Sequence, residues 1–218
     1  MTNKQTPVQT APQEPVVSLF SGMAAYVKNH KQSVLSAVLI LVLAAVLGYA
    51  YNAHVKNVQE KSWTAYYTAQ KAVQQNPADL AALDGVNTQF PGTLAAQYAQ
   101  LLKGDLLYAQ ENFAQAIDAY EPLLNASNET LRTDAALSLG AARQAVKDYQ
   151  GSIKVLSDFI AQNPTSFALP QAYFTLALSQ ELAGNKQAAA ETYQLLLTDY
   201  TKTYFGKMAK DKLTVLNK

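Results

Sequence analysis

The sequence predicts an all-α protein with one transmembrane helix near the N-terminus, followed by an α-solenoid of about four helical hairpins plus a capping helix. Three observations predict this fold class. An uncharged apolar run fills residues 33–51, residues 49–76 contain neither glycine nor proline, and small residues recur at intervals of 36 or 37 further along. A chain of 218 residues is long enough for one domain of moderate size with appendages.

The apolar run reads SVLSAVLILVLAAVLGYAY, and its uncharged flanks extend it to residues 32–53. At a rise of ~1.5 Å per residue, residues 33–51 span about 28 Å as a helix, close to the hydrocarbon thickness of a bilayer. A cleaved signal peptide is the competing interpretation, with Gly48-Tyr49-Ala50 as the small-x-small site. The run exceeds the usual ~7–15 residues of a signal peptide, which favours an uncleaved anchor.

Lysines before the run favour a cytoplasmic N-terminus. Residues 1–32 hold three lysines against one glutamate, whereas Lys56 and Lys61 stand against Glu60 just beyond the run. By the positive-inside rule, residues 52–218 then form a periplasmic domain if the source is a bacterium. The expected localisation is the inner membrane, with a single pass.

Two segments precede the membrane helix. Residues 1–15 are rich in Thr, Gln and Pro, which predicts a disordered cytoplasmic tail. Residues 16–32 predict a basic amphipathic juxtamembrane helix lying on the membrane surface, and a simple continuation of the membrane helix explains them equally well. Its apolar face consists of Val16, Phe20, Met23 and Val27.

The second part of the chain repeats. Gly104, Gly140 and Ala177 are 36 and 37 residues apart, and a second small residue follows each after twelve positions (Ala116, Ser152, Ala189). Only such residues fit where two antiparallel helices approach closely. Pro164 ends one of the predicted second helices. Because one hairpin buries too little surface to be stable alone, neighbouring hairpins must stack into a solenoid.

The stretches SLGAARQAVKDYQGSIKVL and LLKGDLLYAQENFAQAIDAY resemble the tetratricopeptide repeat, and ALSQELAGNKQAAAETY does so less closely. The resemblance covers about residues 60–203, with a degenerate first unit from Trp63 to Pro91. It implies helical hairpins followed by a capping helix over residues 203–217. The membrane helix is expected to continue out of the membrane without a break to Pro77, and its outer part is expected to be the first helix of the first repeat.

A narrower resemblance covers more of the chain. The lead-in SLFSGMAAYVKNHKQS, the single membrane helix and FPGTLAAQYAQLLKGDLL are similar to the YfgM-type ancillary subunits of the SecYEG translocon. This resemblance implies translocon subunits, periplasmic chaperones or emerging chains as partners. The function expected is a membrane-anchored adaptor. The alternative is a scaffold for cell-envelope or cell-division assembly without a role in export.

Composition argues against catalysis. The chain has no cysteine, which excludes disulfides, thiol catalysis and cysteine-based zinc sites, and its two histidines, His30 and His54, flank the apolar run. No glycine-rich phosphate loop or partnered carboxylate pair is apparent, and a net charge of +1 gives no field for nucleic acid. We therefore expect no enzyme activity, cofactor, metal or small-molecule substrate, although an enzyme with an unrecognised site is a third hypothesis.

A groove lined by the first helix of each hairpin is the expected partner-binding site. Its mixture of aromatic and aliphatic residues suits an extended or helical apolar peptide, while the alternative is that half of these side chains pack between hairpins. The predicted groove residues are Tyr98, Leu101, Asp105, Tyr108, Leu137, Ala141, Gln144, Phe174, Leu178 and Glu181. Family members that capture a C-terminal carboxylate use Lys and Asn on this face, so the resemblance implies no carboxylate capture here.

Charge divides along the outer domain. Residues 52–201 hold nine Lys or Arg against fourteen Asp or Glu, and residues 202–218 hold five Lys against Asp211. A basic tail after an acidic solenoid suits contact with anionic lipid or an acidic partner. A solvated helix end explains the same pattern.

Overall fold

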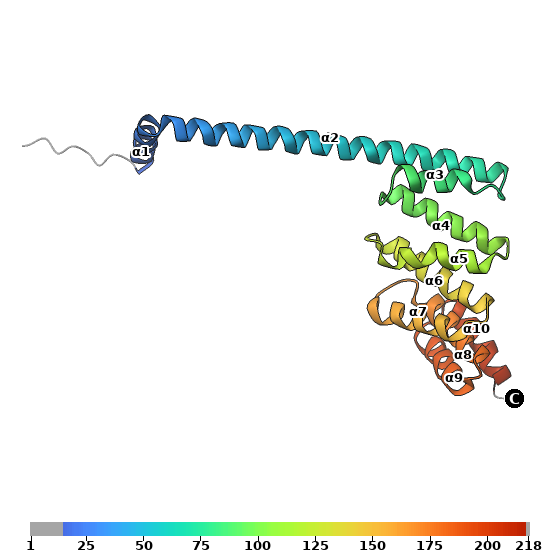
Figure 1. Ribbon diagram of the computed structural model, residues 1–218. Coiled ribbons are helices and arrows are strands. Elements are labelled where there is room, and N and C mark those ends of the chain that lie inside the picture. Colours follow the sequence, from blue (N-terminus) through green and yellow to red (C-terminus); the bar gives the residue numbers. More distant parts are fainter. Residues whose placement is uncertain (1–14, 217–218) are drawn as a thin grey trace, which may run out of the picture. The chain divides into compact units, whose positions relative to one another are not determined.

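The computed structural model describes residues 15–216, and their side chains from residue 20 onward (Figure 1). Within that range the chain consists of helices and contains no strand, which confirms the all-α class. It divides into two units, residues 1–56 and residues 57–218. The tail predicted for residues 1–15 lies outside the described residues except for Pro15, which begins the first helix.

The first unit contains α1 (Pro15–Asn29) and the beginning of α2 (Lys31–Gln75), separated at His30. Phe20, Met23 and Val27 of the predicted amphipathic face are exposed, and the side chain of Val16 is outside the described part. Among the described residues, α2 is the one helix long and apolar enough to cross a membrane. Among the described residues the leucines of the apolar run are exposed, for example Leu39 at 68% and Leu41 at 70%.

The second unit is a stack of helical hairpins closed by one further helix, as the repeat predicted. The described part of this unit has four hairpins, because the end of α2 serves as the first helix of the first one. The first hairpin consists of residues 57–75, at the end of α2, paired with α3 (Ala81–Gln89). The others are α4 (Leu94–Ala109) with α5 (Phe113–Tyr120) and the 3₁₀ helix η1 (Glu121–Asn125), α6 (Glu129–Ala145) with α7 (Tyr149–Gln162), and α8 (Leu169–Leu182) with α9 (Lys186–Asp199). The capping helix is α10 (Tyr204–Leu216).

The turn inside hairpins two, three and four has the same backbone geometry each time. Glu111, Lys147 and Gly184 adopt left-handed φ values of 62°, 65° and 84°. The next residue donates its N–H to the carbonyl five positions back, as Asp148 does to Arg143 at 2.8 Å. This is the Schellman ending of a helix, in which a left-handed residue satisfies the last carbonyls. Only the last hairpin uses glycine there, so the repeat imposes the turn at Glu111 and Lys147 despite their side chains.

Small residues lie where the paired helices approach most closely. A Cβ atom on Gly140 would lie 2.9 Å from Leu156 of α7, and one on Gly104 would collide with the ring of Tyr120. Tyr120, Leu156 and Tyr193 occupy the same repeat position and are almost completely buried. The close helix contacts inferred from the spacing of the small residues are therefore confirmed at Gly104 and Gly140.

Candidate partner-binding surface

Three of the predicted groove residues lie inside the packing between hairpins. Leu101, Leu137 and Phe174 are only 8%, 9% and 8% exposed. Phe174, for example, packs its ring 5.8 Å from that of Tyr193 and 5.7 Å from that of Phe205 of the capping helix. Burial of this kind stabilises the stack and leaves little of these side chains for a partner. Ala141 and Leu178 are half-buried.

Two further predicted residues form polar contacts between neighbouring elements. The Gln144 amide donates to the Thr175 carbonyl at 3.0 Å and to Ser179 Oγ at 2.7 Å, which joins hairpin three to hairpin four. Glu181 accepts from the Tyr193 hydroxyl at 3.0 Å and pairs with Lys212 of α10, also at 3.0 Å. Both side chains therefore connect successive elements of the solenoid.

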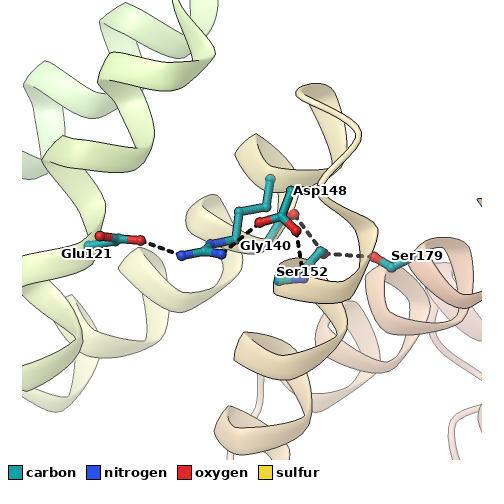
Figure 2. A network of polar contacts seen from close by, with 7 residues as sticks. Glu121, Gly140, Asp148, Ser152 and Ser179 are labelled. Atoms are coloured by element: carbon teal, nitrogen blue, oxygen red, sulfur yellow. Dashed lines mark hydrogen bonds and ion pairs between the residues drawn. The ribbon is translucent and has the colours of Figure 1, made fainter. Parts of the chain in front are cut away.

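A buried chain of hydroxyl groups continues the Gln144 contact. Figure 2 shows Ser152 between Ser179 and Gly140 in this chain. Ser179 Oγ lies 2.8 Å from Ser152 Oγ, and Ser152 Oγ lies 2.8 Å from the Gly140 carbonyl. Both serines are completely buried. The order Gln144, Ser179, Ser152, Gly140 lets each hydroxyl accept one hydrogen bond and donate one, so every member of the chain is satisfied.

Arg143 joins hairpin two to hairpin three through its ion pairs with Glu121 and Asp148, the two acidic residues labelled in Figure 2. Its guanidinium pairs with Glu121 at the start of η1 and with Asp148, 2.8 Å away at the start of α7. Asp148 also caps α7, because its other carboxylate oxygen accepts from the Gly151 N–H at 3.0 Å. Arg143 was not predicted as a functional residue, although its position one residue before Gln144, at the end of a first helix, was an available signal.

The other predicted residues, Tyr98, Asp105 and Tyr108, remain accessible, and the first two belong to a patch that begins on α2. Trp63 contacts three tyrosine rings at centroid distances of 5.6 to 5.9 Å. Tyr67 is 60% exposed, and Trp63, Tyr66 and Tyr98 are half-buried. Asp105 of α4 and Asp134 of α6 continue the patch. We call these six residues the aromatic–acidic patch: Trp63, Tyr66, Tyr67, Tyr98, Asp105 and Asp134.

Packing around the two carboxylates removes part of their hydration and raises the pKa of both Asp105 and Asp134 above the ordinary value. A hydrogen bond from the Tyr120 hydroxyl, 2.8 Å away, opposes the rise at Asp105, and the nearby Asp134 adds to it. Burial likewise raises the pKa of Tyr66, with contributions from Tyr67, Tyr98 and Asp105. The electrostatic influence of Asp105 thus reaches the aromatic part of the patch.

Four residues of the patch were not predicted as groove residues. Trp63 was predicted only as the start of a degenerate repeat unit, although the run WTAYY concentrates three aromatic residues on one stretch of helix. Asp134 stands 36 residues after Tyr98 and so occupies the equivalent position in the next repeat unit. Extending the predicted groove residue Tyr98 by one repeat would therefore have identified it. For Tyr66 there was no indication in the sequence of a binding role beyond its position in this aromatic run.

A second open surface lies between α2 and α3. This groove has a volume of ≈ 710 Å³, with small residues such as Ala65, Ala82 and Gly85 among its lining. Glu60 and Lys61 both line it, so it carries no bias of charge. Within the described residues no three His, Asp or Glu side chains lie close enough together to hold a metal ion.

Stacked hairpins of this kind define a helical-repeat scaffold, a class whose extended surfaces bind other proteins. Residues 25–169 match a family model described as a tetratricopeptide repeat-like domain, and residues 171–203 match that of the tetratricopeptide repeat. The first match covers well over half of the chain, so the protein belongs to the tetratricopeptide repeat-like family. No curated protein matches the chain.

Proposed function

We propose that the protein is a membrane-anchored adaptor whose repeat domain binds protein partners on the periplasmic side, next to the Sec translocon and periplasmic chaperones. The observation that carries this proposal is the extent of the family match. It runs from residue 25 to residue 169 and so takes in the apolar run as well as the repeats. The family model therefore includes both the predicted anchor and the repeat scaffold, which supports a scaffold that works beside a membrane.

The anchor is supported by the exposed apolar side chains of α2 over residues 33–51. Leucine and valine side chains that are exposed all round a helix have a lower free energy in lipid than in water. The lysines before this stretch favour a cytoplasmic N-terminus. The translocon as neighbour comes from the resemblance of the lead-in and the first repeats to the YfgM-type subunits.

Topology is the first test. A reporter enzyme that is active only outside the cytoplasm, fused after Lys218, should be active in a bacterial host. The mature protein should keep the residues before the apolar run in mass spectrometry. Reporter activity found only in the cytoplasm would reverse the orientation, and a mature N-terminus near Tyr51 would replace the anchor with a cleaved signal peptide.

The partner is the second test. A photo-crosslinking amino acid is placed at Tyr108, which is 37% exposed on α4, and at Asp118 of α5 as a control position. Translocon subunits, chaperones or exported chains should be captured from Tyr108 in living cells. Capture of cell-division or envelope-assembly proteins in their place would support the alternative scaffold function.

A further inference from the structure

The aromatic half of the patch is open to solvent and rich in ring faces. Trp63 stacks on Tyr67 with an interplanar angle of 28°, while Tyr66 meets it edge-on at 89°. The Tyr67 ring is 60% exposed although it belongs to a cluster of four rings. The faces of Trp and Tyr attract cations, most strongly when the site is partly shielded from water.

The acidic half of the patch has no cation of its own. Within the described residues neither Asp105 nor Asp134 forms an ion pair. On α4 and α6 the basic side chains are engaged elsewhere: Lys103 pairs with Asp84, Arg143 pairs with Glu121 and Asp148, and Arg132 donates to the Ala126 carbonyl. Partial loss of hydration makes two uncompensated carboxylates unfavourable in the free protein. A cation arriving from outside would offset that cost.

We propose that the aromatic–acidic patch binds a segment of a partner protein that carries a lysine or arginine among apolar residues. The methylene stem of such a side chain packs on the tyrosine and tryptophan rings, and its charged head reaches the carboxylates. A patch that extends over α2, α4 and α6 requires a ligand longer than a single ion. The inference rests on the proposed adaptor function and names the chemistry of the bound segment.

The test uses the full-length protein in nanodiscs of zwitterionic phosphatidylcholine, which do not attract the probes by charge. Three fluorescein-labelled twelve-residue peptides share one Leu/Phe/Ser framework and differ at two positions, which hold Lys, Gln or Glu. Fluorescence anisotropy gives the affinity of each peptide. The Lys peptide should bind most tightly and the Glu peptide most weakly, and added NaCl should weaken the Lys peptide alone.

Variants then assign the effect to the patch. Asp105→Asn with Asp134→Asn should weaken the Lys peptide by about tenfold and leave the Gln peptide unchanged. Asp118→Asn with Asp211→Asn removes two exposed carboxylates outside the patch, on α5 and α10, and should change neither peptide. Tyr67→Ser should weaken the Lys and Gln peptides together, because it removes ring surface rather than charge.

Equal affinity for the Lys and Gln peptides, or full Lys-peptide binding by the Asp105/Asp134 variant, would overturn the inference. In that case binding of all three peptides alike would still support a protein-binding adaptor. If no peptide binds while Tyr108 captures partners in cells, the cationic segment is wrong and the adaptor function stands. Circular dichroism and melting of each variant confirm that a lost affinity reflects the patch and not the fold.

Discussion

The early and late hairpins use equivalent positions for opposite purposes. Tyr108, Gln144 and Glu181 occupy the same place at the end of α4, α6 and α8. The Tyr108 ring lies 5.1 Å from that of its neighbour Phe113, and the residue is 37% exposed. Gln144 and Glu181 are hydrogen-bonded to the next hairpin or to the capping helix. At this repeat position the late hairpins therefore have side chains that bond to the next element, whereas Tyr108 of the second hairpin stays accessible.

Electrostatics follows the same division. Glu181 in the last hairpin is paired with Lys212, whereas Asp105 in the second hairpin forms no ion pair among the described residues. A repeat protein is held together by interfaces between neighbours, so the interfaces that are most fully satisfied form the rigid part. The comparison indicates that the late hairpins form the rigid part, whereas the early ones leave more of their first-helix side chains accessible for the binding that we propose.

The largest effect should come from overpacking a close helix contact in the late part. Gly140→Leu places a side chain where even a Cβ atom would lie 2.9 Å from Leu156. Unfolding of the 52–218 fragment should become easier by about 1–3 kcal/mol or more, measured by denaturant titration. The fragment is a suitable host because it contains all four hydrophobic clusters of the described chain.

Gly85→Ala is the matched control in the early part. A Cβ there would have only Gln89 Nε2 nearby, at 3.8 Å, and the residue lies within α3. Because alanine favours a helix over glycine, this change should stabilise the fragment by about 0.5–1 kcal/mol. Equal stability losses at the two glycines would contradict the difference between the early and late hairpins.

A smaller loss should follow from breaking the buried hydroxyl chain. Ser152→Ala removes the donor to the Gly140 carbonyl, while the Ser179 hydroxyl keeps the Thr175 carbonyl as an acceptor at 2.9 Å. Unsatisfied buried polar groups cost about 1–3 kcal/mol, and we expect the lower half of that range in the free energy of unfolding. Ser157→Ala, at an exposed position of α7, should stay within about 0.5 kcal/mol of wild type. An unchanged Ser152→Ala variant would remove the chain from the stabilising contacts.

The smallest effect concerns Asp105. Its pKa is raised in the folded protein, mainly by loss of hydration, so the ionised carboxylate disfavours folding at neutral pH. Asp105→Asn keeps an acceptor for Tyr120 and should raise the melting temperature slightly at pH 7, by less than about 2 °C. The gain should shrink as pH falls through the raised pKa and vanish below about pH 4, where the unfolded carboxylate is also protonated. A gain that is independent of pH would contradict the electrostatic explanation.

The repeat was predictable from sequence because its signal is local and periodic. Gly104 and Gly140 lie where helices touch, and such contacts admit few residue types, so they leave a mark at every period. The long α2 was predictable for the same reason, since no glycine or proline interrupts residues 49–76. The hairpin turns at Glu111 and Lys147 left no glycine to find, and only the backbone reveals their left-handed geometry.

The sequence by itself therefore determined the class of fold, the number of hairpins and the extent of the apolar run. The tertiary structure alone decided which first-helix side chains are available. Leu101, Leu137 and Phe174 share the helical face expected of a groove, yet packing against neighbouring elements buries them, and for Phe174 these include the capping helix. Periodicity specifies the face of a helix that a side chain occupies, whereas its exposure depends on the distance and tilt of a neighbour about 36 residues away. Asp105, Asp134 and Glu181 all lie on first helices of successive repeat units. Their neighbours in the tertiary structure decide which of them has a cation: Glu181 pairs with Lys212, and the two aspartates form no ion pair among the described residues.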